Sequence, residues 1–367
     1  MNVLLTGAGR RNFLVHFFQE ALGRRGRVIA CDASATAPAL AQADQKIIVP
    51  PMDHPDYCDV LLSICRDNRV RLIVSVNDLE LSTLARSASR FHEVGTIPLV
   101  ASPEIVATCH DKWAAFRWLK AHGLSTPETY LTLADAHAAI ARGALSFPLL
   151  IKPRWGTSSI GIETVENERE LQLAHEWGKI QIGRTILAKM NQADPDHAFV
   201  FQERIEGQEY GIDVVNDLNG KYAATLARRK LAMRAGNTDR ATSVAEPELE
   251  RLGQILSRHL AHIGSIDCDV IATSKGWFVL DMNPRLGGGY PFSHMAGANL
   301  PAALLAWADG EEADPAWLRY QPGVLSSRCD GVVVVDFPLR PETTAMYTFI
   351  RENKVPAQMA ESIGRNV

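Results

Sequence analysis

The stretch FVLDMNPRLGGG, residues 278–289, decides the fold. It begins in an apolar run that predicts a strand, and residues two apart on a strand point to the same side. Asp281 and Asn283 therefore direct a carboxylate and an amide oxygen toward one cavity, and such hard oxygen donors suit Mg²⁺. Arg285 continues this parity, where a guanidinium could bind a phosphoryl group during transfer. An edge strand that closes on a Pro-Arg turn would also fit this stretch, and the residues leave that alternative open.

Three glycines follow this strand, and a ligand can approach bare backbone there, so Gly287 and Gly288 are candidate substrate contacts. The order of an acid, any residue, then Asn-Pro-Arg resembles the metal-binding strand of the ATP-grasp superfamily. The likeness is to its carboxylate–amine ligases and to one half of the carbamoyl-phosphate synthetase large chain. It implies an α/β chain, with an N-terminal parallel-sheet domain before a two-subdomain ATP-grasp fold of α+β type.

The totals describe an ordinary globular chain. The 367 residues suggest two or three domains at roughly 150 residues each. A net charge of −4 gives no general basic surface for nucleic acid, and no apolar run approaches the ~20 residues that cross a membrane. The first residues place apolar side chains before positive ones, the reverse of a signal peptide. The six cysteines are scattered without a Cys-x-x-Cys pair, which favours reduced thiols in a cytoplasmic protein over a zinc site.

Short strand-like and helical stretches alternate over the first third of the chain. We expect strands at 2–5, 28–32, 46–49 and 72–76, and helices at 13–22 and 56–68. Such alternation predicts a parallel sheet with right-handed crossovers.

The first turn invites a dinucleotide interpretation. Gly7 and Gly9 match two glycines of GxGxxG, and Asp32 stands where an acid would bind the ribose. Asn12 occupies the third glycine position, which weakens NAD binding, and the ATP-grasp resemblance instead implies a domain that contributes to a substrate cleft. Asp78 and Glu80 follow a strand end, and family members often carry an acidic pair there that contacts a substrate amine. Capping of a helix by Asp78 is an equal alternative.

Two lysines and a glycine-rich loop predict a phosphate site. Lys112 opens a helix, and in the resembled family the lysine at that place contacts nucleotide phosphates. Lys152 ends the buried strand 149–151, where a lysine is costly to bury without an anion. The loop that follows supplies backbone donors for phosphates, and the resemblance equates it with the loop over the β- and γ-phosphates, although a hairpin turn remains open. Its candidate residues are Gly156, Thr157, Ser158, Ser159 and Gly161.

The resemblance also implies where the nucleoside binds. The segment Glu203, Arg204 and Ile205 matches the hinge whose backbone contacts adenine, with Met282 as an apolar face. Glu209 matches the acid that holds the ribose, and a carboxylate accepts from two hydroxyls.

Cations and acids in the next strands complete the expected site. Arg228 or Lys230, which share a strand face, could hold the γ-phosphate or a substrate carboxylate. Asp269 aligns with the family's other metal ligand, and we expect it to oppose Asp281 on a neighbouring antiparallel strand, where two carboxylates favour a cation. We predict an irregular loop at 234–243, a strand at 331–337 and a helix at 341–352.

These patterns predict four segments: residues 1–108 as the preceding domain, 109–195 and 196–310 as the ATP-grasp subdomains, and 311–367 as an extension. The resemblance implies ATP with Mg²⁺ or Mn²⁺, and a ligase that joins a carboxylate to an amine through an acyl phosphate. Bicarbonate activation and a non-catalytic ATP-binding regulator are the alternatives. The expected partners are small-molecule acids and amines, not nucleic acid or membrane, and a homodimer is left open.

Overall fold

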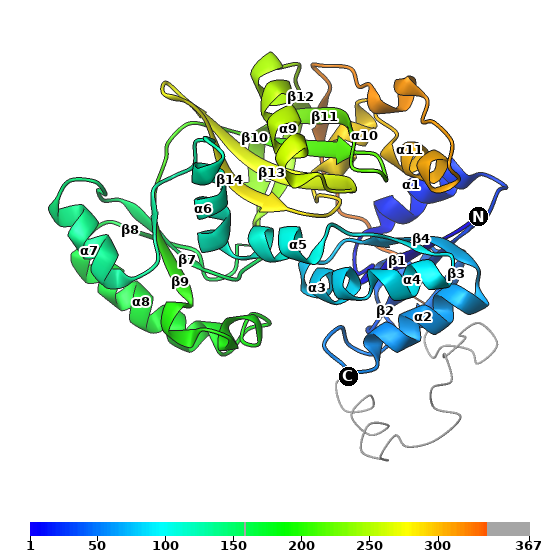
Figure 1. Cartoon of the computed structure of the whole chain (residues 1–367), viewed down its shortest axis with the longest axis horizontal. Helices are drawn as coiled ribbons and strands as arrows, with labels where there is room; N and C mark the ends of the chain where they lie inside the picture. The colour runs from blue at the N-terminus through cyan, green and yellow to red at the C-terminus, as the bar shows by residue number, and fades with distance from the viewer. Residues whose placement is uncertain (158, 336–367) are drawn as a thin grey trace, which may run out of the picture. The chain divides into compact units, whose positions relative to one another are not determined.

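The computed structural model describes residues 1–157 and 159–335, which form two compact units. One unit is Met1–Pro98 with the described residues 331–335, and the other is Leu99–Asp330. Figure 1 draws their helices and strands along the chain. Within the described ranges, every helix is too short or too polar to span a bilayer.

The first unit is built on a five-stranded sheet in the order β3-β2-β1-β4-β5. β1 pairs in parallel with both β2 and β4, and β2 pairs in parallel with β3, as the alternating pattern predicts. The strands are β1 (Asn2–Thr6), β2 (Arg27–Asp32), β3 (Gln45–Ile48), β4 (Val70–Ser75) and β5 (Ile97–Leu99), and the helices are α1 (Asn12–Leu22), α2 (Tyr57–Asp67), α3 (Asp78–Arg86) and α4 (Ala88–Glu93).

The turn after β1 is closed by the chain's own acid. Gly7 and Gly9 have φ of +52° and +49°, which favours glycine at both places. The Gly9 N–H donates to Asp32 Oδ2 at 2.9 Å, and the Ser34 N–H donates to Asp32 Oδ1 at 2.8 Å. Asp32, the acid that suggested a ribose contact, therefore holds two local backbone groups.

The second unit contains two antiparallel sheets, and its first lobe carries the smaller one. This lobe's four-stranded sheet has the order β6-β9-β7-β8, with α7 and α8 contributing to one apolar core. In Figure 1 it is the green-cyan lobe that includes α7 and α8. Its elements are β6 (Thr129–Tyr130), α7 (Leu133–Ala141), β7 (Leu149–Pro153), β8 (Glu163–Val165), α8 (Glu168–Ile182) and β9 (Phe199–Glu203).

The larger sheet of this unit has six strands in the order β14-β13-β10-β11-β12-β15. One of its faces packs against α5, α6 and α9 around an apolar core. The strands are β10 (Gln208–Asn216), β11 (Tyr222–Arg234), β12 (Asn237–Ser243), β13 (Gly264–Thr273), β14 (Gly276–Asn283) and β15 (Leu325–Ser327), and the helices are α5 (Pro103–His110), α6 (Lys112–Ala121), α9 (Pro247–Leu260), α10 (Tyr290–Met295) and α11 (Leu300–Ala308). Short 3₁₀ turns lie at Pro38–Ala41, Met190–Gln192, Pro195–His197 and Pro315–Leu318.

The α/β fold class is confirmed, but several local predictions are wrong. The expected loop at 234–243 is mostly β12, which pairs with β11 on one side and β15 on the other. Its buried residues are small or polar, so it lacks the apolar alternation that marks a strand. Residues 331–335 form no strand, while 336–337 and the expected helix at 341–352 lie outside the described residues.

Candidate functional site

Oxygen-bearing side chains gather on one face of β13 and β14. Asp269 lies directly opposite Asp281 in the ladder, and Asp267 lies opposite Asn283. Opposed residues, and residues two apart on one strand, share a face of the sheet. The predicted opposition of Asp269 and Asp281 is therefore confirmed, and it brings four oxygen-bearing side chains to one face.

Lys230 joins this face from β11. Its Nζ lies 2.6 Å from Asp269 Oδ1 and 3.5 Å from Glu209 Oε2. Burial tends to lower the pKa of Lys230, but the attraction and hydrogen bond of Asp269 outweigh it and raise the pKa above its usual value. Lys230 therefore stays charged and lies between Glu209, the expected ribose contact, and Asp269, the expected metal ligand.

Arg228 has a different environment although it shares a strand face with Lys230. Its Nη1 contacts Asp213 Oδ2 and its Nη2 contacts Asp267 Oδ1, both at 2.6 Å, and its side chain is 2% exposed. Ser293 Oγ donates to the same Asp213 oxygen at 3.1 Å. Burial tends to lower the pKa of Arg228, and the two carboxylates raise it above its usual value. Arg228 is thus enclosed in an ion-pair network inside the unit.

The triglycine segment packs over this network. A Cβ on Gly289 would lie 2.1 Å from Arg228 Nη2, and one on Gly287 would lie 2.3 Å from Asp267 Cγ. A Cβ on Gly288 would come no closer than 3.4 Å, to Asn237 Oδ1. The fit over the ion pairs thus accounts for glycine at 287 and 289, whereas glycine at 288 has no such steric cause.

Two lysines, one from the smaller sheet and one from α6, lie within electrostatic range of each other, and Lys152 also lies within range of Asp281 and Asp269. Lys152, half-buried at the end of β7, donates from Nζ to Gln202 Oε1 at 2.6 Å. Lys112 donates from Nζ to the Gly156 carbonyl at 3.0 Å. Burial, reinforced by repulsion from Lys112, lowers the pKa of Lys152 to about 8, while Asp281 and Asp269 oppose that shift. A polyanion beside both lysines would relieve the repulsion.

The base of the glycine-rich loop is pinned to the start of α6. Arg154 makes two hydrogen bonds to Asp111, at 2.8 and 2.6 Å, and a third to Asp194 at 3.0 Å. Asp111 also caps α6, accepting from the Trp113 and Ala114 N–H groups. The loop tip carries Ser159 at φ +57° and Gly161 at φ +72°, whereas Ser158 lies outside the described residues. Thr157 and Gly161 are half-buried and Ser159 is exposed, so the fixed base presents a partly accessible tip.

The expected hinge lies between β9 and β10. The Glu203 N–H donates to the Glu128 carbonyl at 2.8 Å, and Glu203 Oε2 accepts from the Glu128 N–H at 3.2 Å. Arg204 is exposed, Ile205 is half-buried, and the Glu209 side chain is 45% exposed. These positions leave the hinge backbone and Glu209 near the surface of the site.

Met282 departs from its expected position. It lies between Asp281 and Asn283 on β14, so its side chain points to the other face of the sheet. There it is 1% exposed and packs in the core with Cys268 and Leu256. The sequence alternation places it away from the site face, so its assignment to the adenine was mistaken.

The expected substrate acids of the first unit are also placed differently. Glu80 is fully buried, and its carboxylate accepts from Thr6 Oγ1 at 2.7 Å, Ser75 Oγ at 2.6 Å and Tyr57 OH at 2.6 Å. Burial raises the pKa of Glu80. Its carboxylate therefore ties β1, β4 and α2 together. Asp78 is buried, and Asn77 rather than Asp78 caps α3, since Asn77 Oδ1 accepts from the Leu79 N–H.

Arg285 and Arg328 flank the glycines. The Arg285 N–H donates to the Asn283 carbonyl at 2.8 Å, and its Nη1 donates to the Leu286 carbonyl at 3.3 Å. Arg328 donates from Nε to the Thr238 carbonyl at 2.7 Å and from Nη2 to the Gly288 carbonyl. Sequence reasoning missed Arg328, Arg154 and Gln202, because each is recognised only by a partner distant in the chain.

A cation fits the oxygen-rich face only with help from a ligand. Among the described residues, no three His, Cys, Asp or Glu side chains form a ready metal group. The available donors are Asp281, the amide oxygen of Asn283 and the Oδ2 of Asp269, since Asp269 Oδ1 accepts from Lys230, and all three residues share one face. Mg²⁺ commonly takes one or two carboxylates and completes its shell with phosphate oxygens and water. The donor set therefore fits Mg²⁺ bound together with a polyphosphate.

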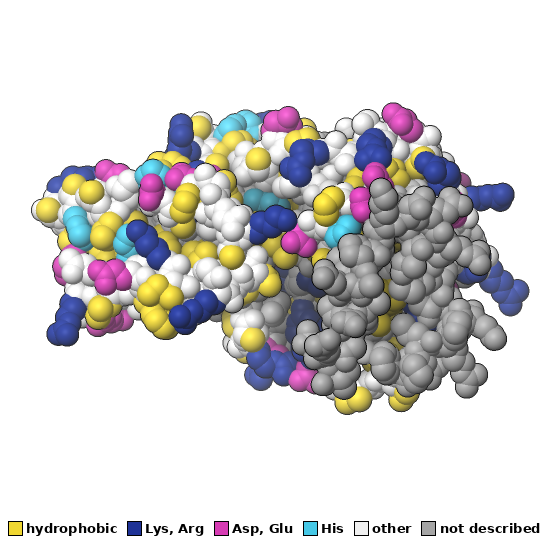
Figure 2. Space-filling view, turned by 90° about the horizontal axis from the view of Figure 1, so that it is seen from below, with side chains coloured by type: hydrophobic (Ala, Val, Ile, Leu, Met, Phe, Trp, Pro, Cys, Tyr) yellow, Lys and Arg dark blue, Asp and Glu magenta, His cyan; other side chains and the backbone are white. Residues whose placement is uncertain are grey.

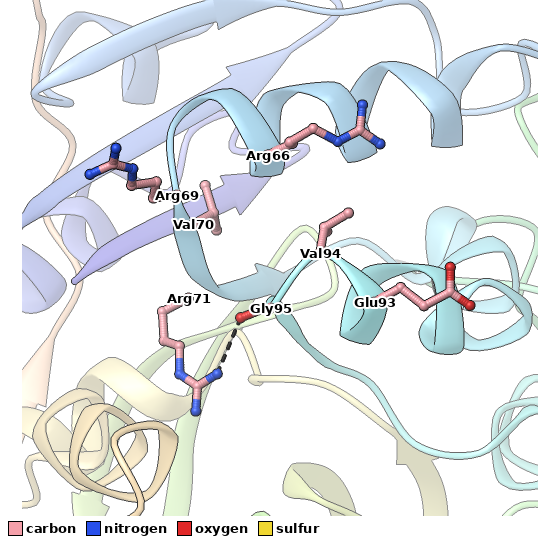
Figure 3. A pocket seen from close by; sticks show the side chains of 7 residues that line it. All are labelled: Arg66, Arg69, Val70, Arg71, Glu93, Val94 and Gly95. Carbon is pink, nitrogen blue, oxygen red and sulfur yellow. Dashed lines mark hydrogen bonds between the residues drawn. The ribbon is translucent and has the colours of Figure 1, made fainter.

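A pocket of about 380 Å³ in the first unit has a different character. It is lined by Arg66, Arg69, Arg71 and Glu93, with Val70, Val94 and Gly95. Figure 3 shows the three guanidinium groups pointing away from one another, and Arg71 Nη1 donates to the Gly95 carbonyl at 3.1 Å. These cations do not converge on one anion, so this pocket is a poor nucleotide site.

Two family models match the chain. The model described as "PylC-like, N-terminal domain" matches residues 3–100, and the model described as "ATP-grasp in the biosynthetic pathway with Ter operon" matches residues 196–325. The first match spans the parallel sheet, and the second spans the six-stranded sheet with its acidic face.

Solved structures with the same fold come from several enzymes. The biotin carboxylase domain of Hydrogenobacter thermophilus 2-oxoglutarate carboxylase is 19% identical with a TM-score of 0.66, and the match covers 88% of this chain and 71% of that one. L-amino acid ligase from Bacillus licheniformis is 17% identical with a TM-score of 0.64, covering 88% and 78%. N5-carboxyaminoimidazole ribonucleotide synthetase from Thermotoga maritima is 17% identical with a TM-score of 0.60, covering 86% and 78%. At these identities the likeness establishes the fold.

Proposed function

This chain belongs to the ATP-grasp superfamily, and from that premise we propose that it is an ATP-dependent ligase joining a carboxylic acid to an amine. The observation that supports the proposal is that Lys152 lies within electrostatic range both of Lys112 and of the acids Asp269 and Asp281, which oppose each other on β13 and β14. Phosphates fit beside the lysines and a cation fits beside the acids. One MgATP molecule supplies both the phosphates and the cation. Its binding would explain why lysines lie close to one another and acids lie close to one another.

Each phosphate contact has a candidate in this arrangement. Lys112 and Lys152 would bind the phosphates, and the backbone N–H groups of Thr157, Ser159 and Gly161 would cover them. Ser158 is assigned with them on the sequence alone. Gln202 orients the Lys152 ammonium through its 2.6 Å hydrogen bond. Gly156 contributes through its carbonyl, which fixes Lys112.

The nucleoside would lie against the hinge. The backbone at Glu203, Arg204 and Ile205 would contact the adenine edge, and Glu209 would accept from the ribose hydroxyls. Lys230 supports Glu209 by keeping its carboxylate oriented at 3.5 Å.

Asp269, Asp281 and Asn283 would hold Mg²⁺, which when bound neutralises charge on the transferring phosphoryl group. Arg285 lies next to these residues and would stabilise the same group. A carboxylate oxygen of the acid attacks the γ-phosphorus while the bond to the β-phosphate breaks, which releases ADP. The amine then attacks the acyl carbon, and phosphate leaves with the acid's oxygen while the amine loses a proton. Arg285 would also donate to the oxyanion of that second step.

The two strand cations receive different roles. Lys230 is the one beside Asp269, so we assign it to the reacting end of the nucleotide. Arg228 is enclosed by Asp213 and Asp267, so we assign it to holding the triglycine segment in place. Gly288, which has room beside it, remains a candidate substrate contact, while Gly287, Asp78 and Glu80 receive structural roles.

A second candidate is activation of bicarbonate as the acid. The similar folds of the biotin carboxylase domain and the N5-carboxyaminoimidazole ribonucleotide synthetase favour it. The chemistry is the same up to the acyl phosphate, since bicarbonate would attack the γ-phosphorus through one oxygen.

Phosphate release in a panel of acids and amines tests the proposal. We expect release to require one acid and one amine together, and to disappear in Asp281→Asn. Release with bicarbonate as the acid would favour the second candidate. Tight ATP binding without release across a wide panel would contradict both and indicate a regulator.

A further inference from the structure

Helix α8 carries apolar side chains on two opposite faces. Its inward face includes Leu171 and Ile182, both buried in the core of its lobe. Its outward face carries Leu173, Trp177 and Ile180, which are 55%, 52% and 50% exposed. The spacing of four and three residues places these three on one stripe. Ile186, just beyond the helix, is 61% exposed and extends the apolar surface.

The rotation of α8 about its axis is fixed by close packing. A Cβ on Gly178 would lie 2.6 Å from the Phe199 ring, so the helix backbone rests directly on β9. His175, on the same inward side, packs edge-on against Phe199 and Phe201 with ring centroids 5.8 and 5.4 Å apart. The helix cannot rotate to bury Trp177 without losing these contacts, so the stripe stays outside.

Acidic residues predominate at the start of α8, and basic residues predominate at its end. Three exposed acids, Glu166, Glu168 and Glu170, lie at or just before the first turn, with Arg169 as the one base among them, and a fourth exposed acid, Glu176, lies in the middle of the helix. The bases Lys179 and Arg184 lie at the other end, where the Arg184 guanidinium is 5.8 Å from the Trp177 ring centroid. Figure 2 shows hydrophobic side chains on this face of the lobe with both basic and acidic ones around them.

We propose that α8 is the docking surface for a second copy of this chain, paired with its own α8 in antiparallel fashion. A twofold axis near Trp177 would bring each acidic end against the partner's basic end and bury the two stripes against each other. The first turn of α8 is net acidic and its other end, from Glu176 to Arg184, is net basic, so the two ends are complementary to those of an antiparallel copy. Tryptophan is also one of the residue types enriched among those that dominate interface energies.

The test is the mass of the full-length protein by light scattering over a range of concentrations. We expect a dimer, with dissociation favoured by salt. Leu173→Glu and Trp177→Glu should each raise the dimer dissociation constant by roughly thirtyfold or more, as loss of a dominant interface residue does. Gln172→Glu is the matched control, because it adds the same charge beside the stripe and should leave the dimer intact.

A cross-linking experiment keeps the proposal testable if a glutamate variant fails to fold. In a Cys329→Ser background, which removes the exposed thiol, Trp177→Cys should form a disulfide-linked dimer under mild oxidation and Gln172→Cys should not. A wild-type protein that is monomeric at every concentration would overturn the proposal. So would a dimer that Trp177→Glu leaves unchanged, because its interface would then lie elsewhere. The result does not depend on the ligase chemistry.

Discussion

Asp269 and Asp281 lie directly opposite each other on β13 and β14, and Lys230 reaches only the first of them. The ladder fixes the spacing of their Cα atoms through backbone hydrogen bonds, so the two side chains start from adjacent positions on one face of the sheet. Asp269 is compensated by the ammonium 2.6 Å from it. Asp281 instead accepts from the neighbouring Met282 N–H at 3.1 Å, and we propose that a cation arriving with a ligand balances its charge.

This arrangement predicts that metal-dependent turnover is separable from nucleotide binding. Asp281→Asn combined with Asn283→Ala should lower kcat by about a hundredfold or more, since a metal clamp contributes several kcal/mol to transition-state stabilisation. ATP affinity measured without Mg²⁺ should change little, because the lysines and the hinge are untouched. Glu250→Gln, on the exposed side of α9, is the control and should behave as wild type. Near-normal turnover in the double variant would show that Asp281 and Asn283 do not bind the catalytic Mg²⁺.

The triglycine segment should respond unequally to alanine. Gly289→Ala should destabilise the protein by roughly 1–3 kcal/mol, because its Cβ meets an arginine locked by two carboxylates and one ion pair must break or shift. Gly288→Ala should cost less than about 0.5 kcal/mol, since its Cβ would have ordinary space. Denaturant unfolding of both variants measures the difference. Equal losses would show that the segment relaxes around Arg228.

The pKa of Lys152 predicts proton uptake when ATP binds. Its pKa is lowered to about 8 by burial and by Lys112, so at a pH just above 8 the side chain is partly neutral. Phosphates favour the charged form and raise this pKa, so binding should draw a proton from solution at that pH. Calorimetry in buffers of different ionisation enthalpy measures the uptake. Lys152→Met should abolish it, whereas Lys120→Met, an exposed lysine paired with Glu128, should not.

The same shift gives the sign of the pH effect on stability. Between pH 8 and the usual lysine value of 10.5, the unfolded chain binds more protons at this position than the folded one. The ligand-free protein should therefore gain stability relative to Lys152→Met as the pH rises through that window. If the protein instead loses stability relative to Lys152→Met between pH 8 and 10.5, the pKa of Lys152 is not lowered by burial.

Arg328 should act as a positioning residue for Gly288. It bridges the Thr238 and Gly288 carbonyls, and a lysine cannot reproduce both contacts of the planar guanidinium. Arg328→Lys should lower kcat or raise the KM of the acid while the ATP dissociation constant stays within error. Arg319→Lys, an exposed arginine in the same C-terminal segment, is the matched control. Equal loss of ATP affinity and turnover would instead indicate a general structural role.

Sequence alone predicts the acidic face well and its surroundings poorly, for a physical reason. β13 and β14 are joined by a tight turn at Thr273–Gly276, so strand parity suffices to oppose Asp269 and Asp281. Arg228 and Lys230 share parity too, yet their partners lie 15 and 39 residues away, and pairing at that distance leaves no local pattern.

The burial of a side chain is equally hard to predict from the sequence. Glu80 is identified as a structural acid only by the hydroxyls of Thr6, Tyr57 and Ser75, which come from three separate elements. β12 forms a hairpin with β11, but it is missed because its buried residues, Thr238, Ala241, Thr242 and Ser243, are small or polar and give no apolar alternation. The positions that the sequence assigns correctly are those whose geometry follows from neighbours along one strand or hairpin.

The bond that breaks in the first step distinguishes an acyl phosphate from an adenylate. In an acyl-phosphate mechanism the oxygen that attacks phosphorus belongs to the acid and leaves with the phosphate. With ¹⁸O in the substrate carboxylate, we therefore expect label in the released inorganic phosphate, measured by mass spectrometry. Thermal denaturation should show stabilisation by ATP with Mg²⁺, about 2.7 kcal/mol at 100 times the dissociation constant, and none by NAD or NADP. The absence of an NAD effect follows from Asp32, whose carboxylate already holds the Gly9 and Ser34 N–H groups. Label found in AMP would establish an adenylate and contradict the phosphoryl-transfer role given to Arg285.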